Sequence, residues 1–124
     1  MPQAVTLQGR RILVVEDDFL VAQALSDALE DAGAIVVGPI GWADEAAAFV
    51  KRNGADFDSA LLDVNLHGKP SYPVADALAE RRVRFVFMTG YGTEAIDDAY
   101  RHHPRCEKPV RMQALLDALS RAEA

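Results

Sequence analysis

The chain has a single cysteine, Cys106, among its 124 residues. An internal disulfide therefore cannot form, and the fold must depend on a hydrophobic core, as is usual in a reducing cytoplasm. No apolar run approaches the ~18 residues that a membrane span needs. The N-terminal stretch MPQAVTLQGR also lacks the apolar core of a signal peptide. These absences predict a soluble cytoplasmic protein with no membrane partner.

Basic residues are in the minority. The chain has 13 Lys and Arg against 19 Asp and Glu, which gives a formal net charge of −6. The phosphate backbone of a nucleic acid would be repelled overall, so we expect no nucleic-acid partner. Half of the residues are hydrophobic (50%), and this composition and length suit one globular domain.

Short apolar runs alternate with amphipathic segments along the chain. Strands are predicted over residues 11–15, 34–38, 59–64, 84–88 and 105–107. Helices are predicted over residues 19–32, 44–52, 72–82, 93–102 and 110–122. The alternation predicts an α/β fold in which five helices cover both faces of a five-stranded parallel sheet. Residues 1–10 are expected to be a flexible lead-in, and residues 11–124 to form the domain.

Polar and charged side chains follow the predicted strands. The first strand ends in Glu16-Asp17-Asp18, the third at Asp63, the fourth at Thr89-Gly90 and the fifth at Lys108-Pro109. The carboxyl ends of parallel strands meet at one edge of the sheet, where such folds bind ligands. We therefore expect these groups to lie side by side.

The chemistry of these groups is coherent. Several carboxylates a few ångströms apart cannot all stay ionised without a cation, and oxygen ligands at an open edge favour Mg²⁺. The metal and Lys108 would offset phosphate charge, while the Thr89 hydroxyl hydrogen-bonds a phosphoryl oxygen. Asp63 would then be a carboxylate placed to attack phosphorus and form an acyl phosphate.

Four motifs, ILVVEDD, LLDVNL, FMTGYG and EKP, occur in this order at the predicted strand ends. Together they resemble the receiver domain of bacterial two-component response regulators, over most of the chain from Arg11 to Ala122. The resemblance implies the flavodoxin-like receiver fold with strand order 2-1-3-4-5. Residues 85–92 are also similar to the FAT GUY subgroup of single-domain regulators, with Met88 in place of an alanine.

The resemblance assigns roles to the acidic residues. It implies that Asp17 binds Mg²⁺ directly and Glu16 mainly through water, while Asp63 accepts the phosphoryl group. Asn65 matches a position whose backbone carbonyl binds the metal. Asp18 lies one place beyond the acidic pair and is expected to cap the helix that follows.

The later motifs match the remaining functional positions. Thr89 matches the hydroxyl residue that moves onto the phosphoryl group, and Gly90 keeps the approach to the acceptor open. Lys108 matches the lysine of the family, and the bond to Pro109 is cis in relatives.

One position departs from the family pattern. Ordinary receivers have Tyr or Phe three residues before the lysine, and this ring swings inward when the threonine moves. Arg105 stands there instead. Tyr91, two residues after Thr89, is the nearest aromatic substitute, so we predict that Tyr91 or the loop around it reports the phosphorylation state.

The resemblance implies a signalling module rather than an enzyme acting on other substrates. A sensor histidine kinase or a histidine phosphotransfer protein would phosphorylate Asp63, and water would later remove the group. Because the printed chain ends at Ala124, soon after the last predicted helix, we expect a single-domain regulator. Its output would pass through a downstream protein target, onward phosphotransfer or draining of the kinase.

Other functions stay open at this stage. A degenerate receiver would bind its partner without phosphorylation. A small haloacid-dehalogenase-like phosphatase shares the Asp nucleophile, but it needs a general acid where this chain has Asn65. A flavodoxin-like nucleotide binder would need a Gly- or Ser-rich loop where Glu16-Asp17-Asp18 stands.

Overall fold

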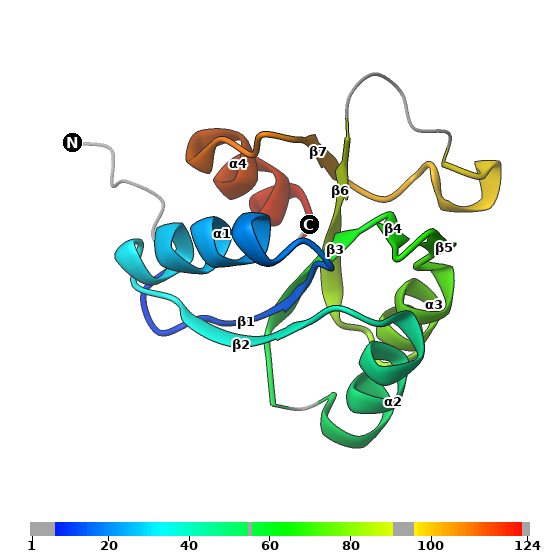
Figure 1. Cartoon of the computed structure of the whole chain (residues 1–124). Coiled ribbons are helices and arrows are strands. Elements are labelled where there is room, and N and C mark those ends of the chain that lie inside the picture. The colour runs from blue at the N-terminus through cyan, green and yellow to red at the C-terminus, as the bar shows by residue number, and fades with distance from the viewer. Residues whose placement is uncertain (1–6, 55, 91–95, 123–124) are drawn as a thin grey trace.

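A parallel sheet forms the centre of the molecule. The computed structural model describes residues 7–54, 56–90 and 96–122. Five strands pair in the order β2-β1-β3-β6-β7, and every pairing is parallel (Figure 1). Their bounds are β1 Arg11–Val15, β2 Ile35–Ile40, β3 Ser59–Asp63, β6 Arg84–Thr89 and β7 Arg105–Glu107. In chain order this is 2-1-3-4-5, so the predicted fold and strand order are confirmed.

Helices cover both faces of the sheet. Figure 1 shows α1 (Phe19–Asp31) and α4 (Met112–Ala122) together on one side, and α2 (Ala43–Asn53) and α3 (Tyr72–Glu80) on the other. Successive residues of each strand point to opposite faces, which divides the core into two clusters. Uninterrupted apolar strands are therefore what a sheet covered on both faces requires. None of the helices in the described ranges is long and apolar enough to cross a membrane.

The carboxylate of Asp18 caps the start of α1. Its Oδ1 accepts hydrogen bonds from the backbone N–H of Leu20 at 2.9 Å and of Val21 at 3.1 Å. These two N–H groups have no partner within the first turn of the helix, so the cap satisfies them. The predicted capping role of Asp18 is confirmed, and it separates this carboxylate from Glu16 and Asp17.

The packed part of the chain begins before β1. Leu7 is buried in the core between the sheet, α1 and α4. Its N–H donates to the Ala32 carbonyl at 3.3 Å, and the Gly9 N–H donates to Gly33 at 2.9 Å. Residues 7–10, expected to be a loosely ordered lead-in, are therefore held against the end of α1 by an apolar side chain.

The prediction of a helix over residues 93–102 is wrong for the part of that range that the structure describes. Residues 96–102 contain one 3₁₀ turn, η1 (Asp98–Tyr100), and no α-helix. The Tyr72 hydroxyl accepts from the Asp97 N–H at 2.9 Å, and the Tyr100 hydroxyl donates to Asp76 at 2.8 Å. The two tyrosine rings stack with centroids 4.1 Å apart. These contacts hold the segment against α3, so the described residues form four α-helices rather than five.

A small hairpin follows β3 and was not predicted. Strands β4 (Asn65–Leu66) and β5 (Lys69–Pro70) pair antiparallel. His67 and Gly68 connect them with φ angles of +51° and +79°. Two consecutive positive φ angles are typical of a type I′ turn, which matches the twist of a two-residue hairpin. The hairpin places His67 beside the end of β1.

The Asp18 cap makes a direct prediction. Asp18→Ala should lower the free energy of unfolding by about 1 kcal/mol, because two N–H groups lose their acceptor. Asp18→Asn keeps a side-chain oxygen at the cap and should stay within a few tenths of a kcal/mol of the wild type. Urea unfolding followed by circular dichroism measures both. Equal losses in the two variants would show that the charge of Asp18, rather than the cap, stabilises the helix.

Candidate functional site

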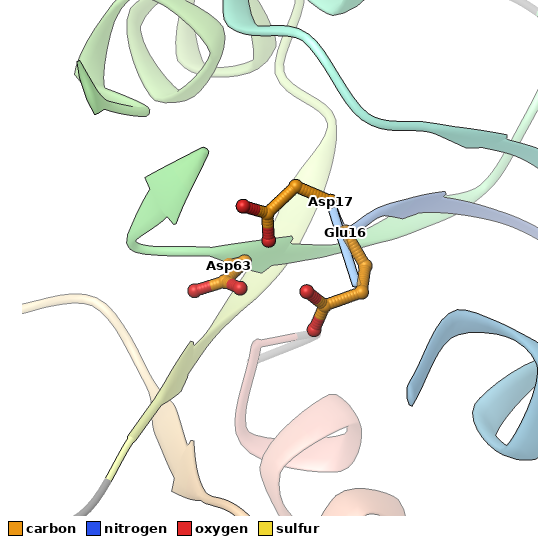
Figure 2. Close-up of side chains that lie close together, drawn as sticks. All are labelled: Glu16, Asp17 and Asp63. Carbon is orange, nitrogen blue, oxygen red and sulfur yellow. The ribbon is translucent and has the colours of Figure 1, made fainter. Parts of the chain in front are cut away.

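Three carboxylates converge at the carboxyl edge of the sheet. Glu16 and Asp17 follow β1, and Asp63 ends β3, the neighbouring strand. One oxygen from each of them lies within 4.8 Å of the others, and Figure 2 shows the three groups gathered around a common space. Glu16 is 3% exposed and Asp63 5%, so two of the three charges are almost removed from water.

The ammonium group of Lys108 bridges the two buried carboxylates. Its Nζ lies 2.6 Å from Glu16 Oε1 and 2.7 Å from Asp63 Oδ2. Burial alone would lower the pKa of Lys108, but the hydrogen bonds to Asp63 and Glu16 outweigh it and raise the pKa. The lysine is therefore a permanent positive charge in this site.

One ammonium does not balance three carboxylates. Burial, and after it the hydrogen bond with the Asp63 carboxyl, raise the pKa of Glu16, which is about 7 once all its neighbours are included. The ion pair with Lys108 and the hydrogen bond from the Asp18 N–H act in the opposite direction. The site thus has an excess of negative charge that a cation would relieve.

The third carboxylate, Asp17, is held by a backbone group. The His67 N–H donates to Asp17 Oδ2 at 2.8 Å. Burial by itself would raise the pKa of Asp17. The hydrogen bond from the His67 N–H and a hydrogen bond with the Glu16 side chain outweigh burial, and the pKa of Asp17 is lowered. Asp17 is therefore the more readily ionised member of the acidic pair.

The other predicted site residues surround Asp63. The Asn65 N–H donates to Asp63 Oδ1 at 3.2 Å. Thr89 is buried at the end of β6, the strand that pairs with β3. The Thr89 hydroxyl donates to the Cys106 carbonyl at 3.5 Å. Gly90 follows directly, and the Lys108–Pro109 peptide bond is cis, as the resemblance implies. The strand ends thus bring Glu16, Asp17, Asp63, Thr89 and Lys108 to one edge.

The two switch candidates have different places. Arg105 is exposed and opens β7, where it pairs in register with Phe87 of β6. Tyr91 lies outside the described residues.

Sequence reasoning missed one neighbour of the site, His67. Its backbone N–H, rather than its side chain, contacts Asp17. Because every residue except proline has this N–H group, the identity of residue 67 does not predict the contact. The sequence could have predicted the hairpin itself, because Gly68 lies between two short extended segments and glycine favours this kind of turn.

The residues present fit a divalent cation. The site supplies converging carboxylate oxygens, the ligands that Mg²⁺ prefers, and it has more negative charge than Lys108 can balance. Asp17 is only partly buried, so the cluster is open to solvent on one side.

No protein-family model matches this chain. Its structure is similar to the solution structure of SdrG from Sphingomonas melonis Fr1, with 39% identity and a TM-score of 0.82. That match covers 94% of this chain and 98% of SdrG. The signal receiver domain of a modulated diguanylate cyclase from Desulfovibrio desulfuricans G20 matches at 27% identity and a TM-score of 0.76, over 93% of this chain and 94% of that one. The chain belongs to the receiver domains of bacterial response regulators.

A curated relative agrees with the receiver family. The sensor protein TorS of Escherichia coli (strain K12) is 31% identical over 99 residues, which are 80% of this chain. The match covers 10% of TorS, so it concerns one segment of a much longer protein. Receiver domains are signalling modules, and the acidic cluster of this one resembles the phospho-accepting site of the family.

Removing the bridging ammonium should destabilise the domain. Lys108→Ala leaves Glu16 and Asp63 buried without their counter-charge, and we expect a loss of about 1–3 kcal/mol of unfolding free energy in EDTA. Urea unfolding at pH 8 measures it, with the exposed Lys69→Ala as the matched control. Equal stability of Lys108→Ala and wild type would contradict a structural role for this ion pair.

Proposed function

We propose that this receiver domain accepts a phosphoryl group on Asp63 in a Mg²⁺-dependent reaction. The observation that carries the proposal is the convergence of Glu16, Asp17 and Asp63 at one edge with Lys108 between two of them. A buried carboxylate beside an ammonium and an open cation site is the arrangement that phosphoryl transfer to an aspartate needs.

The ligands of the metal are proposed from the family resemblance, and the convergence of three carboxylates supports them. Asp17 and Asp63 would bind Mg²⁺ directly, together with the backbone carbonyl of Asn65, and Glu16 would act mainly through water. When bound, the cation neutralises charge on the phosphoryl oxygens. The low pKa of Asp17 supports its role, because an ionised carboxylate is the form that binds a cation.

Asp63 is the nucleophile in this proposal. A carboxylate oxygen of Asp63 forms a bond to phosphorus while the bond between phosphorus and the donor breaks, and that electron pair leaves with the donor. Lys108 already contacts Asp63 Oδ2 at 2.7 Å, so its ammonium is close to where the phosphoryl oxygens arrive. Attack of water on phosphorus later releases inorganic phosphate and restores the carboxylate.

Thr89 would respond to the new group. Its hydroxyl donates to the Cys106 carbonyl at 3.5 Å, a long hydrogen bond that is weak. Turning this hydroxyl toward the phosphoryl group replaces it with a charge-assisted hydrogen bond, which is stronger. Gly90 leaves the approach open, and Tyr91 is proposed to report the change in place of the aromatic residue that Arg105 replaces.

The donor is proposed to be a sensor histidine kinase or a histidine phosphotransfer protein in the cytoplasm. The similarity to a segment of the sensor protein TorS supports a two-component partner. An apolar groove of about 580 Å³ reaches from Leu20 on α1 to Gly90 and Lys108, and Phe19 and Leu20 are 75% and 77% exposed. Exposed apolar area beside the acceptor suits a protein donor.

The output is proposed to be protein binding or onward phosphotransfer. The similarity of residues 85–92 to the FAT GUY motif supports a single-domain regulator of that subgroup. The net charge of −6 supports a protein rather than a nucleic acid as target.

Phosphorylation is tested by intact mass after incubation with acetyl phosphate. The wild type should gain one phosphoryl group when Mg²⁺ is present and none in EDTA, and Asp63→Asn should gain none. Asp56→Asn, an exposed aspartate before β3, is the matched control and should label normally. Labelling of Asp63→Asn at the rate of the wild type would place the acceptor elsewhere.

The metal site is tested by titrating Mg²⁺ and following backbone amide chemical shifts. Asp17→Asn removes a charged ligand and should weaken the apparent affinity at least about tenfold. Asp18→Asn keeps the helix cap and should bind Mg²⁺ nearly as the wild type does. The opposite order of the two variants would show that the acidic pair is misassigned.

A further inference from the structure

Trp42 is a large aromatic residue that remains 53% exposed, and its ring has a defined neighbour. It stacks on the imidazole of His67 with ring centroids 3.6 Å apart and an interplanar angle of 16°. Trp42 precedes α2, whereas His67 is in the hairpin after Asp63, so the stack joins two separate loops at the carboxyl edge. Its side chain makes no capping hydrogen bond to α2.

The stack contacts His67, a residue whose backbone conformation is unfavourable. His67 has a φ of +51°, in the left-handed region that residues with a Cβ seldom adopt. This conformation persists only when surrounding contacts hold it. The Trp42 ring covers one face of the imidazole and supplies such a contact.

The backbone held in this way is the one that contacts Asp17. The His67 N–H donates to Asp17 Oδ2 at 2.8 Å, which fixes the direction of that carboxylate. The turn that carries Trp42 also lies against the acidic strand end. A Cβ on its neighbour Gly41 would come within 3.5 Å of Asp17 Cα and of the Glu16 carbonyl oxygen. Trp42 and Asp17 are therefore linked through two short contacts and one close backbone approach.

We propose that Trp42 is a positioning residue for the metal ligand Asp17, acting through its stack on His67. The inference rests on the proposed function, since it concerns the same cation site. Groups that orient a metal ligand by hydrogen bonding affect affinity strongly without touching the ion. Trp42 acts one contact further out, and so a smaller but measurable effect is expected.

The test compares Mg²⁺ affinities measured from amide chemical shifts, a readout independent of phosphorylation. Trp42→Ala should weaken the apparent affinity by about threefold to tenfold, at the lower end of such outer-shell effects. Trp42→Phe keeps an aromatic ring over the imidazole and should remain within about twofold of wild type. Ile35→Ala removes another exposed hydrophobic side chain, one that is 47% exposed at the amino end of β2, and should leave the affinity unchanged.

A second variant approaches the stack from its other side. His67→Gly removes the imidazole, keeps the N–H that contacts Asp17, and suits the positive φ of the turn. In this background Trp42→Ala should have no further effect on Mg²⁺ affinity, because the indole has no imidazole to hold. Wild-type affinity in Trp42→Ala, or an equal loss from Trp42→Ala with and without the imidazole, would overturn the inference.

Asp17→Asn distinguishes this inference from the proposed metal site. If Asp17→Asn loses affinity and Trp42→Ala does not, the stack has no positioning role and the metal site stands. If the wild type shows no Mg²⁺-dependent shifts at all, or Asp17→Asn binds as well as the wild type, the metal site itself is wrong. A dispersed amide spectrum of each variant shows that the fold is retained.

Discussion

The ammonium of Lys108 between Glu16 and Asp63 is the interaction on which the site depends. Two carboxylates that are 3% and 5% exposed could not stay ionised so close together without it. The lysine follows β7, an edge strand, whereas Glu16 follows β1, near the other edge of the sheet. The ion pair therefore forms only when β3 and β6 have assembled between them, which makes the site a product of the whole sheet.

The sheet can carry this charge because its remaining side chains are apolar. Strand residues alternate between the cluster under α1 and α4 and the cluster under α2 and α3, and both clusters are closed to water. Polar groups are then confined to the ends of the strands, where one edge still faces solvent. The ends of the buried strands β1 and β3 thus bring carboxylate oxygens within 4.8 Å of one another.

The acidic edge is held from two sides. Lys108 contacts Glu16 and Asp63 from β7, and the His67 N–H contacts Asp17 from the hairpin after β3. If Asp63 is phosphorylated as we propose, new negative charge enters this space, and Thr89 is the buried hydroxyl that can turn toward it. Arg105 is exposed where the family resemblance implies an aromatic ring, so under this proposal the response continues through other residues.

The sequence alone determined the strands and what stands at their ends. Uninterrupted apolar runs mark buried parallel strands, and parallel strands bring their carboxyl ends to one edge, so Glu16, Asp17, Asp63, Thr89 and Lys108 could be grouped in advance.

Only the tertiary structure decided which local preferences were overridden. The sequence predicts a helix over residues 93–102, but the described part of this range forms a 3₁₀ turn. The hydrogen bonds of Tyr72 and Tyr100 hold this turn on α3. Leu7 is likewise ordered by a core that lies beyond its own segment. The stack of Trp42 on His67 and the backbone contact to Asp17 join residues far apart in the chain. Such contacts depend on how finished elements pack, and no local pattern in the sequence encodes them.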